Sequence, residues 1–150
     1  MELSDEIRIA APLDVVYQAL NNPEILQECI PGCEDLTQTS PEIFAAKVVL
    51  KIGPVKARFT GEVTLDTSGA PAGMTLTGEG KGGAAGFAKG GADVTLTEDG
   101  AETVLAYTAN VDVGGKIAQL GSRLIAGTAK KLSGTFFTRF GEIVSDQPVS

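Results

Sequence analysis

Residues 55–66 read VKARFTGEVTLD, and apolar or small side chains occupy every second position of this stretch. The positions between them carry Lys, Arg, Thr, Glu and Asp. Such alternation is typical of a strand that has one buried face and one face in water. Four further stretches between residues 46 and 112 repeat the pattern, and turn residues such as Gly53-Pro54 separate them. We therefore predict an antiparallel sheet at the centre of the fold.

The sequence on either side of these strands predicts one more strand and three helices. Residues 1–10 alternate in the same way. Pro12 then begins a helical pattern that Asn21-Asn22-Pro23 ends, and a second short helix follows over residues 24–29. After Gly114-Gly115 the apolar spacing changes to three or four residues. This spacing predicts one long amphipathic helix built on Ile117, Leu120, Leu124, Thr128, Leu132, Phe136, Phe140 and Ile143.

Together these elements indicate the α+β class and a single domain over residues 1–150. The expected architecture is a curved antiparallel sheet of about seven strands, with two short helices after the first strand. The long C-terminal helix is expected to pack on the concave face of that sheet. A chain of 150 residues is long enough to bury a substantial core.

One helix is too narrow to cover the concave side of so wide a sheet, and we expect an apolar cavity between them. Many inward positions of the predicted strands are small, among them Ala57, Gly61, Gly80, Ala92 and Ala109. The alternative is that the sheet simply closes onto the helix. The residues expected to line the cavity are Val48, Leu50, Phe59, Val63, Met74, Leu76, Phe87, Tyr107, Leu120 and Leu124.

The composition excludes several kinds of active site. The chain has no histidine, so it lacks the Ser-His-Asp and Cys-His arrangements of hydrolases and every histidine-ligated metal centre. Acidic residues outnumber basic ones 19 to 12, and the formal charge of -7 opposes binding of nucleic acid. We assign no catalytic residue, no metal ligand and no cofactor.

Residues 78–83 read GEGKGG and match the G-x-G-x-x-G pattern of dinucleotide sites. Such a site requires a helix directly after the glycines, and the following AAGFAKGG has no helical periodicity. We therefore interpret the glycine-rich stretch as a bulged or sharply bent pair of strands.

Cys29 and Cys33 flank Pro31-Gly32 and are too few to complete a tetrahedral metal site. They are interpreted either as idle thiols or as a pair with a redox or persulfide role. The charged N-terminus carries no signal-peptide core, and no apolar stretch approaches the roughly 18 residues that span a bilayer. We therefore expect a cytoplasmic protein with reduced thiols.

Lys116, Arg123 and Lys130 follow one another at seven-residue intervals, which would place them on one face of the long helix. No acidic residue occurs from Gly114 to Gly141, although the whole chain is acidic. One interpretation is a solvated helix face. The other is a docking surface for anionic lipid headgroups or for an acidic partner protein.

Four segments, taken in order, resemble the carbon monoxide dehydrogenase G-subunit family, which is part of the START-like (SRPBCC, helix-grip) superfamily. These segments are 11–24, 29–34, 53–56 with 59–61, and 114–125 with Phe136-Phe137. The first resembles the superfamily's passage from strand to helix, and the second the motif after the second helix. The third is similar to the central hairpin, and the fourth to the final helix. The resemblance covers nearly the whole chain and implies a helix-grip fold that binds a lipophilic ligand.

The resemblance also implies partners. Members of the family are associated with molybdenum-containing carbon monoxide dehydrogenases and related hydroxylases. They help to recruit or mature the enzyme at the membrane and handle a lipophilic molecule, a quinone being one candidate. Many members continue into a C-terminal membrane anchor. This sequence stops at Ser150, soon after the final helix, which leaves anchoring by its own chain open.

Three functions follow as hypotheses. The favoured one is a non-enzymatic binding module for an apolar ligand, a quinone or a lipid. It would serve a molybdenum hydroxylase from the cytoplasm, peripheral to the inner membrane. The second is an assembly factor that acts only through its surface and holds no ligand. The third is a cyclase or dehydratase, because START-like cavities in other families host such enzymes, and it would need buried acid-base groups.

Overall fold

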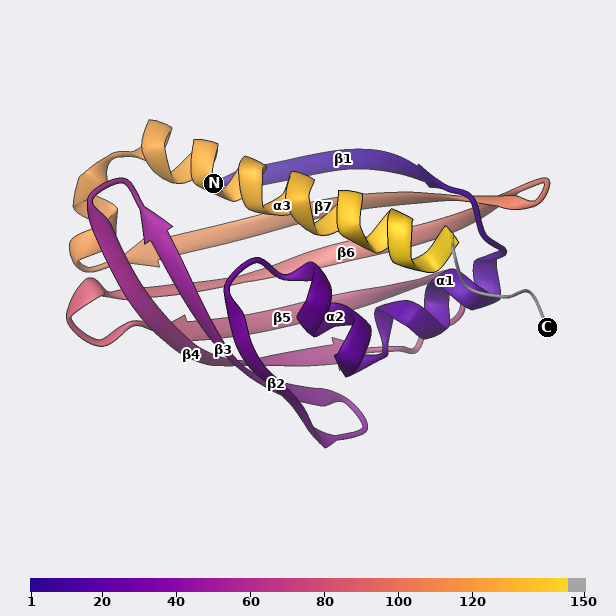
Figure 1. Ribbon diagram of the computed structural model, residues 1–150, viewed down its shortest axis with the longest axis horizontal. Coiled ribbons are helices and arrows are strands. Elements are labelled where there is room, and N and C mark those ends of the chain that lie inside the picture. Colours follow the sequence, from indigo (N-terminus) through magenta and orange to yellow (C-terminus); the bar gives the residue numbers. More distant parts are fainter. Residues whose placement is uncertain (146–150) are drawn as a thin grey trace.

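The computed structural model describes residues 1–145, which form one curved sheet, three α-helices and two short 3₁₀ turns (Figure 1). The strands are β1 Glu2–Ile9, β2 Cys33–Ser40, β3 Ile43–Ile52, β4 Val55–Asp66, β5 Gly73–Lys81, β6 Phe87–Asp99 and β7 Glu102–Gly114. The helices are α1 Leu13–Leu20, α2 Pro23–Cys29 and α3 Ser122–Ser145, and the 3₁₀ turns are η1 Gly83–Ala85 and η2 Lys116–Leu120. The predicted α+β class and the order of its elements are confirmed.

All seven strands of the described chain lie in one antiparallel sheet, in the order β1-β7-β6-β5-β4-β3-β2. Strands β2 to β7 form a meander, because each pairs with the next one along the chain. The first strand lies at the far edge, where Glu2 pairs with Asn110 and Ile9 with Thr103 of β7. The predicted antiparallel sheet of about seven strands is therefore confirmed.

Helix α3 crosses the concave face of the sheet, and α1 and α2 pack beside its C-terminal half (Figure 1). The main core lies where these three helices meet the sheet. Its buried members include Val16 of α1, Cys29 of α2, Leu105 of β7 and Phe140 of α3. Full burial of an aliphatic or aromatic side chain contributes about 1.5–3 kcal/mol. Packing against the sheet therefore holds α3 in place.

The start of the long helix differs from the prediction. Lys116–Leu120 form the 3₁₀ turn η2, and α3 begins only at Ser122. Gly121 between them adopts a φ of +97°, a conformation that favours glycine, and the helix is interrupted there. The apolar spacing continues across this break, which is why periodicity alone predicted one uninterrupted helix.

The glycine-rich stretch also differs from its interpretation as a bulge. Strands β5 and β6 pair without a break from Gly73↔Thr95 to Lys81↔Phe87, and η1 forms the turn between them. Within the stretch, a Cβ on Gly80 would meet only Phe59, at 3.9 Å, and a tighter contact lies opposite it, at Gly61 of β4. A Cβ atom on Gly61 would lie 2.2 Å from the carbonyl oxygen of Glu79, so no larger residue fits there without a shift of the backbone.

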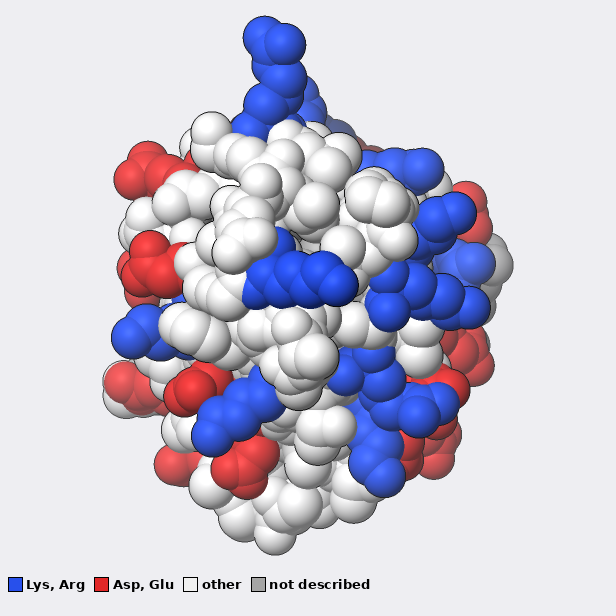
Figure 2. All heavy atoms as spheres, turned by 90° about the vertical axis from the view of Figure 1, so that its left-hand side faces the viewer, with Lys and Arg blue, Asp and Glu red and all other residues white. Residues whose placement is uncertain are grey.

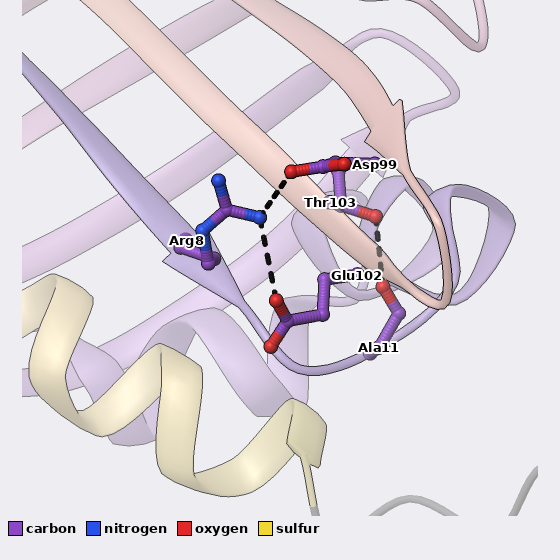
Figure 3. A network of polar contacts seen from close by, with 5 residues as sticks. All are labelled: Arg8, Ala11, Asp99, Glu102 and Thr103. Atoms are coloured by element: carbon purple, nitrogen blue, oxygen red, sulfur yellow. Dashed lines mark hydrogen bonds and ion pairs between the residues drawn. The ribbon is translucent and has the colours of Figure 1, made fainter.

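Polar contacts attach the end of β1 and the following loop to the β6–β7 hairpin (Figure 3). Arg8 donates to Asp99 at 2.5 Å and to Glu102 at 3.3 Å, but all three side chains are exposed, and such pairs contribute about 1 kcal/mol or less. The second contact is buried. Thr103 donates from Oγ1 to the carbonyl oxygen of Ala11 at 2.8 Å, and within residues 1–145 it is the only buried polar side chain.

We expect Thr103→Val to lower the free energy of unfolding by about 1–3 kcal/mol, because the buried carbonyl group of Ala11 would lose its donor. Thr108→Val in the same strand is the matched control, since its side chain is exposed and its loss should change stability by about 0.5 kcal/mol or less. Urea unfolding measures both variants, and equal stabilities would contradict the role assigned to Thr103.

Candidate functional site

An apolar cavity of about 610 Å³ lies between the concave face of the sheet and α3. Inward positions of β3 to β7 form its floor, and the side of α3 between Ile125 and Phe137 forms its roof. Met1 and the α2–β2 connection, through Ile30 and Pro31, complete the wall. This volume lies within the range of small-molecule and cofactor sites, about 300–1,000 Å³.

The cavity exists because the inward positions at the centre of the sheet are small. Gly61, Gly78, Gly80, Ala92 and Ala109 face α3 there. At the other end of the same sheet face the inward residues are large and buried, and they fill the space under the helices: Phe44, Leu65, Met74, Leu96 and Leu105. One half of the concave face is therefore covered by packed side chains, and the other half borders the cavity.

Side-chain exposure follows this division. Leu65 and Met74 are 2% and 5% exposed, as expected for side chains packed on all sides. Val63 and Leu76, two residues away on the same strands and the same face, are only partly buried. An inward apolar side chain that keeps part of its surface exposed faces open space. This difference marks the boundary between the packed core and the cavity.

An aromatic cluster closes the cavity at the end nearer the main core. Phe137 of α3 stacks on Tyr107 of β7, with ring centroids 5.0 Å apart and planes inclined by 19°. Phe136 lies edge-on to Phe137 at 4.9 Å and stacks on the buried Phe140 at 5.9 Å. Phe136 and Phe137 also line the cavity, so they form its aromatic end wall.

A second, smaller cluster closes the opposite end. Ile117 of η2 packs with Ile52 and Phe59, which flank the β3–β4 turn, and with Ala85 of η1. All four side chains are buried, and Ile117 is only 1% exposed. Leu120 packs against the outside of this cluster. The aromatic cluster thus fixes the second half of α3 on the sheet, the smaller cluster fixes η2, which leads into α3, and the space between them stays open.

The wall of the cavity is suited to an uncharged, apolar molecule. Glu62, Glu79 and Lys89 border the cavity, but strand alternation turns their side chains to the exposed face. Thr128 of α3 donates its hydroxyl group to the carbonyl oxygen of Leu124 at 2.9 Å. Within residues 1–145 no group of three or more Asp, Glu, Cys or His side chains is placed to hold a metal ion. The described wall therefore presents apolar surface and no inward carboxylate.

The structure brings together half of the side chains that the sequence predicts as lining. Val48, Leu50, Phe59, Val63 and Leu76 border the cavity. The other five lie elsewhere: Met74 and Tyr107 belong to or pack against the main core, Leu120 packs on the smaller cluster, and Phe87 and Leu124 are 39% and 37% exposed. Strand alternation gives the face of a residue but not its position along the cavity, which explains Met74 and Tyr107.

Sequence reasoning missed most of the roof. The cavity side of α3 is formed by Ile125, Thr128, Ala129, Leu132, Ser133, Phe136 and Phe137. Within α3, Leu124 is 37% exposed and Ile125 is buried, because neighbouring residues of a helix point about 100° apart. On the sheet, Ala88, Val111 and Val113 were also missed, although their alternation with Lys89, Asn110 and Asp112 is a usable signal.

The predicted basic stripe is not one helical stripe. Arg123 and Lys130 lie seven residues apart on α3, whereas Lys116 lies in η2 before the break at Gly121. All three side chains are exposed. The structure therefore places Lys116 with the turns at the end of the sheet.

The two cysteines are free thiols that differ in exposure. Cys29 is buried in α2, and Cys33 at the start of β2 is half-buried. Burial raises the pKa of Cys29 to about 11, with a further upward effect from Glu28, and Arg139 opposes both. Burial also raises the pKa of Cys33. Both thiols are therefore protonated at neutral pH, which disfavours thiolate chemistry.

We expect the folded state to lose stability as the pH rises from about 9 towards 11. The neutral thiol of Cys29 is favoured in the folded chain, whereas an unfolded chain releases this proton at lower pH, near 9.0. Cys29→Ala should therefore show a smaller loss over this interval. Urea unfolding of the wild type and the variant at several alkaline pH values measures the difference, and parallel curves would contradict the burial of this thiol.

Comparison with known families gives a match over most of the chain. A model of the carbon monoxide dehydrogenase G-subunit family (CoxG) matches residues 6–145. A search of curated proteins found no match. Within residues 1–145, no helix combines the length and the hydrophobicity needed to pass through a bilayer.

Solved structures share the fold over nearly the whole chain. A conserved protein from Geobacillus kaustophilus is 28% identical with a TM-score of 0.90, and the match covers 97% of this chain and 95% of that one. The Zhui aromatase/cyclase from Streptomyces sp. R1128 is 12% identical with a TM-score of 0.70, over 96% and 93% of the two chains. A START superfamily protein from Mycobacterium smegmatis is 13% identical with a TM-score of 0.66, over 95% and 98%. The last two show the fold alone, and the predicted START-like architecture is confirmed.

Proposed function

This chain belongs to the carbon monoxide dehydrogenase G-subunit family, and from that premise we propose that it is a non-catalytic binding module for an apolar small molecule. The module is an accessory to a molybdenum-containing carbon monoxide dehydrogenase or a related hydroxylase. It acts in recruitment or maturation of that enzyme at the cytoplasmic surface of the membrane. The observation that carries the proposal is the apolar cavity of about 610 Å³ between the sheet and α3.

The chemistry of the cavity supports an uncharged ligand such as a quinone or a lipid chain. Val48, Leu50, Phe59, Val63 and Leu76 supply aliphatic and aromatic contact surface on the floor. Apolar surface removed from water contributes about 25 cal/mol per Å², so a ligand that fills the cavity gains affinity without polar recognition. A charged group inside would lose its hydration with no partner to replace it.

An enzymatic role has one argument in its favour, the shared fold with an aromatase/cyclase. That likeness at 12% identity concerns the fold and not the chemistry. General acid-base catalysis requires titratable groups within reach of the substrate, and the described cavity wall turns Glu62 and Glu79 away from the interior. The wall therefore supports binding better than it supports catalysis.

Filling the cavity is expected to abolish ligand uptake while the fold survives. Gly80 and Ala109 both face the cavity, and a Cβ on Gly80 would meet only Phe59, at 3.9 Å. The double variant Gly80→Leu/Ala109→Phe should bind a neutral dye such as N-phenylnaphthylamine at least about tenfold more weakly, a change of about 1.4 kcal/mol. Fluorescence titration measures this affinity.

The matched control is Ala106→Phe, on the same strand as Ala109 but on the opposite face of the sheet. Its dye affinity should equal that of the wild type, and circular dichroism checks that both variants fold. Unchanged dye binding in the cavity-filled variant would refute the proposed site.

Native mass spectrometry after gentle purification separates the binding module from an assembly factor that acts only through its surface. The wild type should carry a co-purifying apolar molecule, and Gly80→Leu/Ala109→Phe should carry less of it. A wild-type protein free of any such molecule, which also takes up no dye, would favour the surface-only assembly factor.

A further inference from the structure

The end of the molecule that closes the cavity is positively charged, although the chain as a whole carries a charge of -7. Three segments form this end: 51–57 at the β3–β4 turn, 81–88 at the β5–β6 turn, and 114–124 through η2 into α3. They contain no Asp or Glu, and their five cations are Lys51, Lys56, Lys81, Lys116 and Arg123. We call these five side chains the basic end.

The three segments are packed together, so the basic end is one surface. Leu124 at the start of α3 lies against the β3–β4 turn, 2.8 Å from the position of a Cβ on Gly53. Gly86 of the β5–β6 turn lies 2.6 Å from the position of a Cβ on Gly115. Figure 2 views the molecule from this end, and Lys and Arg side chains are spread over it among uncharged atoms, with Asp and Glu mostly towards the margins.

The fold gains nothing visible from this concentration of charge. Lys51 and Lys56 stand directly opposite each other in the β3–β4 pairing, and like charges in such positions repel. The ion pairs found within residues 1–145 involve Arg8 and Arg58, and none involves the basic end. Solvent ions, or an anionic surface outside the chain, would relieve this repulsion.

Two exposed apolar side chains stand among these cations. Phe87 is 39% exposed and lies over Gly114, and Leu124 is 37% exposed beside the β3–β4 turn. With Met1 they are the only large hydrophobic side chains of residues 1–145 with this degree of exposure. Phe87 begins β6 and Leu124 lies in the first turn of α3, and neither side chain lines the cavity, which fits a soft, flat acceptor better than a shaped protein pocket. Cations around protruding apolar side chains are typical of contact with anionic bilayers.

We propose that the basic end docks on an anionic phospholipid bilayer, with Phe87 and Leu124 in the headgroup region and the five cations on lipid phosphates. This docking surface adds a partner to the proposed function, and it rests on that function only for the claim that an apolar ligand passes between the bilayer and the cavity. Docking would bring the buried cluster around Ile117, which closes the cavity, next to the lipid phase in which an apolar molecule dissolves. Lys130 lies two turns further along α3 and is not part of this surface.

Sedimentation with vesicles tests the proposal on the full chain. The wild type should bind vesicles of equal parts phosphatidylcholine and phosphatidylglycerol, and should not bind pure phosphatidylcholine. Lys51→Gln/Lys56→Gln should lower the partition coefficient about 25-fold, since each cation near the surface contributes about fivefold. Phe87→Ser/Leu124→Ser should also weaken binding, and added salt should weaken binding of the wild type.

The matched control is Lys47→Gln/Lys130→Gln, which removes the same charge from positions outside the three segments. Lys47 lies in the middle of β3 opposite Thr60, and Lys130 lies two turns along α3 from Arg123. This variant should bind vesicles like the wild type. Equal losses in both lysine double variants, or no wild-type binding to anionic vesicles, would overturn the proposal. Binding to an acidic partner protein without vesicle binding would overturn it as well.

Dye uptake in vesicle-free solution keeps this test separate from that of the cavity. Lys51→Gln/Lys56→Gln should take up the neutral dye with wild-type affinity, because both side chains are exposed and lie outside the cavity. A wild type that binds vesicles but no dye would refute the cavity function and leave the docking surface standing.

Discussion

Helix α3 and the turn η2 that leads into it are held on the sheet by two clusters of side chains, and the cavity lies between these clusters. The aromatic cluster of Phe136, Phe137 and Tyr107 holds α3, and the cluster of Ile52, Phe59 and Ile117 holds η2. Protein interiors normally close such gaps, because a void loses the dispersion contacts of its lining. Here the two clusters and the small residues between them prevent closure. The cavity, its length and its apolar wall all follow from this arrangement.

An apolar wall selects its occupant by size and shape. The described lining offers little to distinguish one uncharged molecule from another, since hydrogen-bonding groups that confer specificity are few. Under the proposed function, the ligand would then be selected by the compartment in which the protein encounters it. Cations and exposed apolar side chains lie at the end where the smaller cluster closes the cavity, which is the end proposed to contact the bilayer.

Much of the fold could be predicted from the sequence, because each element follows a local periodicity. Two-residue alternation in β4 and a three-to-four-residue spacing in α3 are properties of neighbouring residues. The residues that line the cavity were harder to predict. Val63 and Met74 both point inward, but whether α3 or the other helices lie above them depends on tertiary packing. The prediction for Leu124 was wrong because a four-residue spacing drifts by about 40° per step around a helix, and the two steps from Leu132 back to Leu124 leave the cavity side of α3. The seven-residue spacing indicated Lys116 and Arg123 of the basic end, but Lys51, Lys56 and Lys81 come from segments that are distant in the sequence, and no periodicity connects them.

The pairing of β1 with β7 also sets the order in which the molecule can be completed during synthesis. Glu2 has Asn110 as its partner, so β1 cannot pair until β7 has been synthesised. Strands β2 to β6 need only their sequence neighbours and can assemble as they emerge. Before β7 is synthesised, β1 has no strand with which to form hydrogen bonds. Sequence-distant contacts of this kind are the slow ones to form, which makes the β1–β7 pairing the last step in completing the sheet, before α3 packs on it.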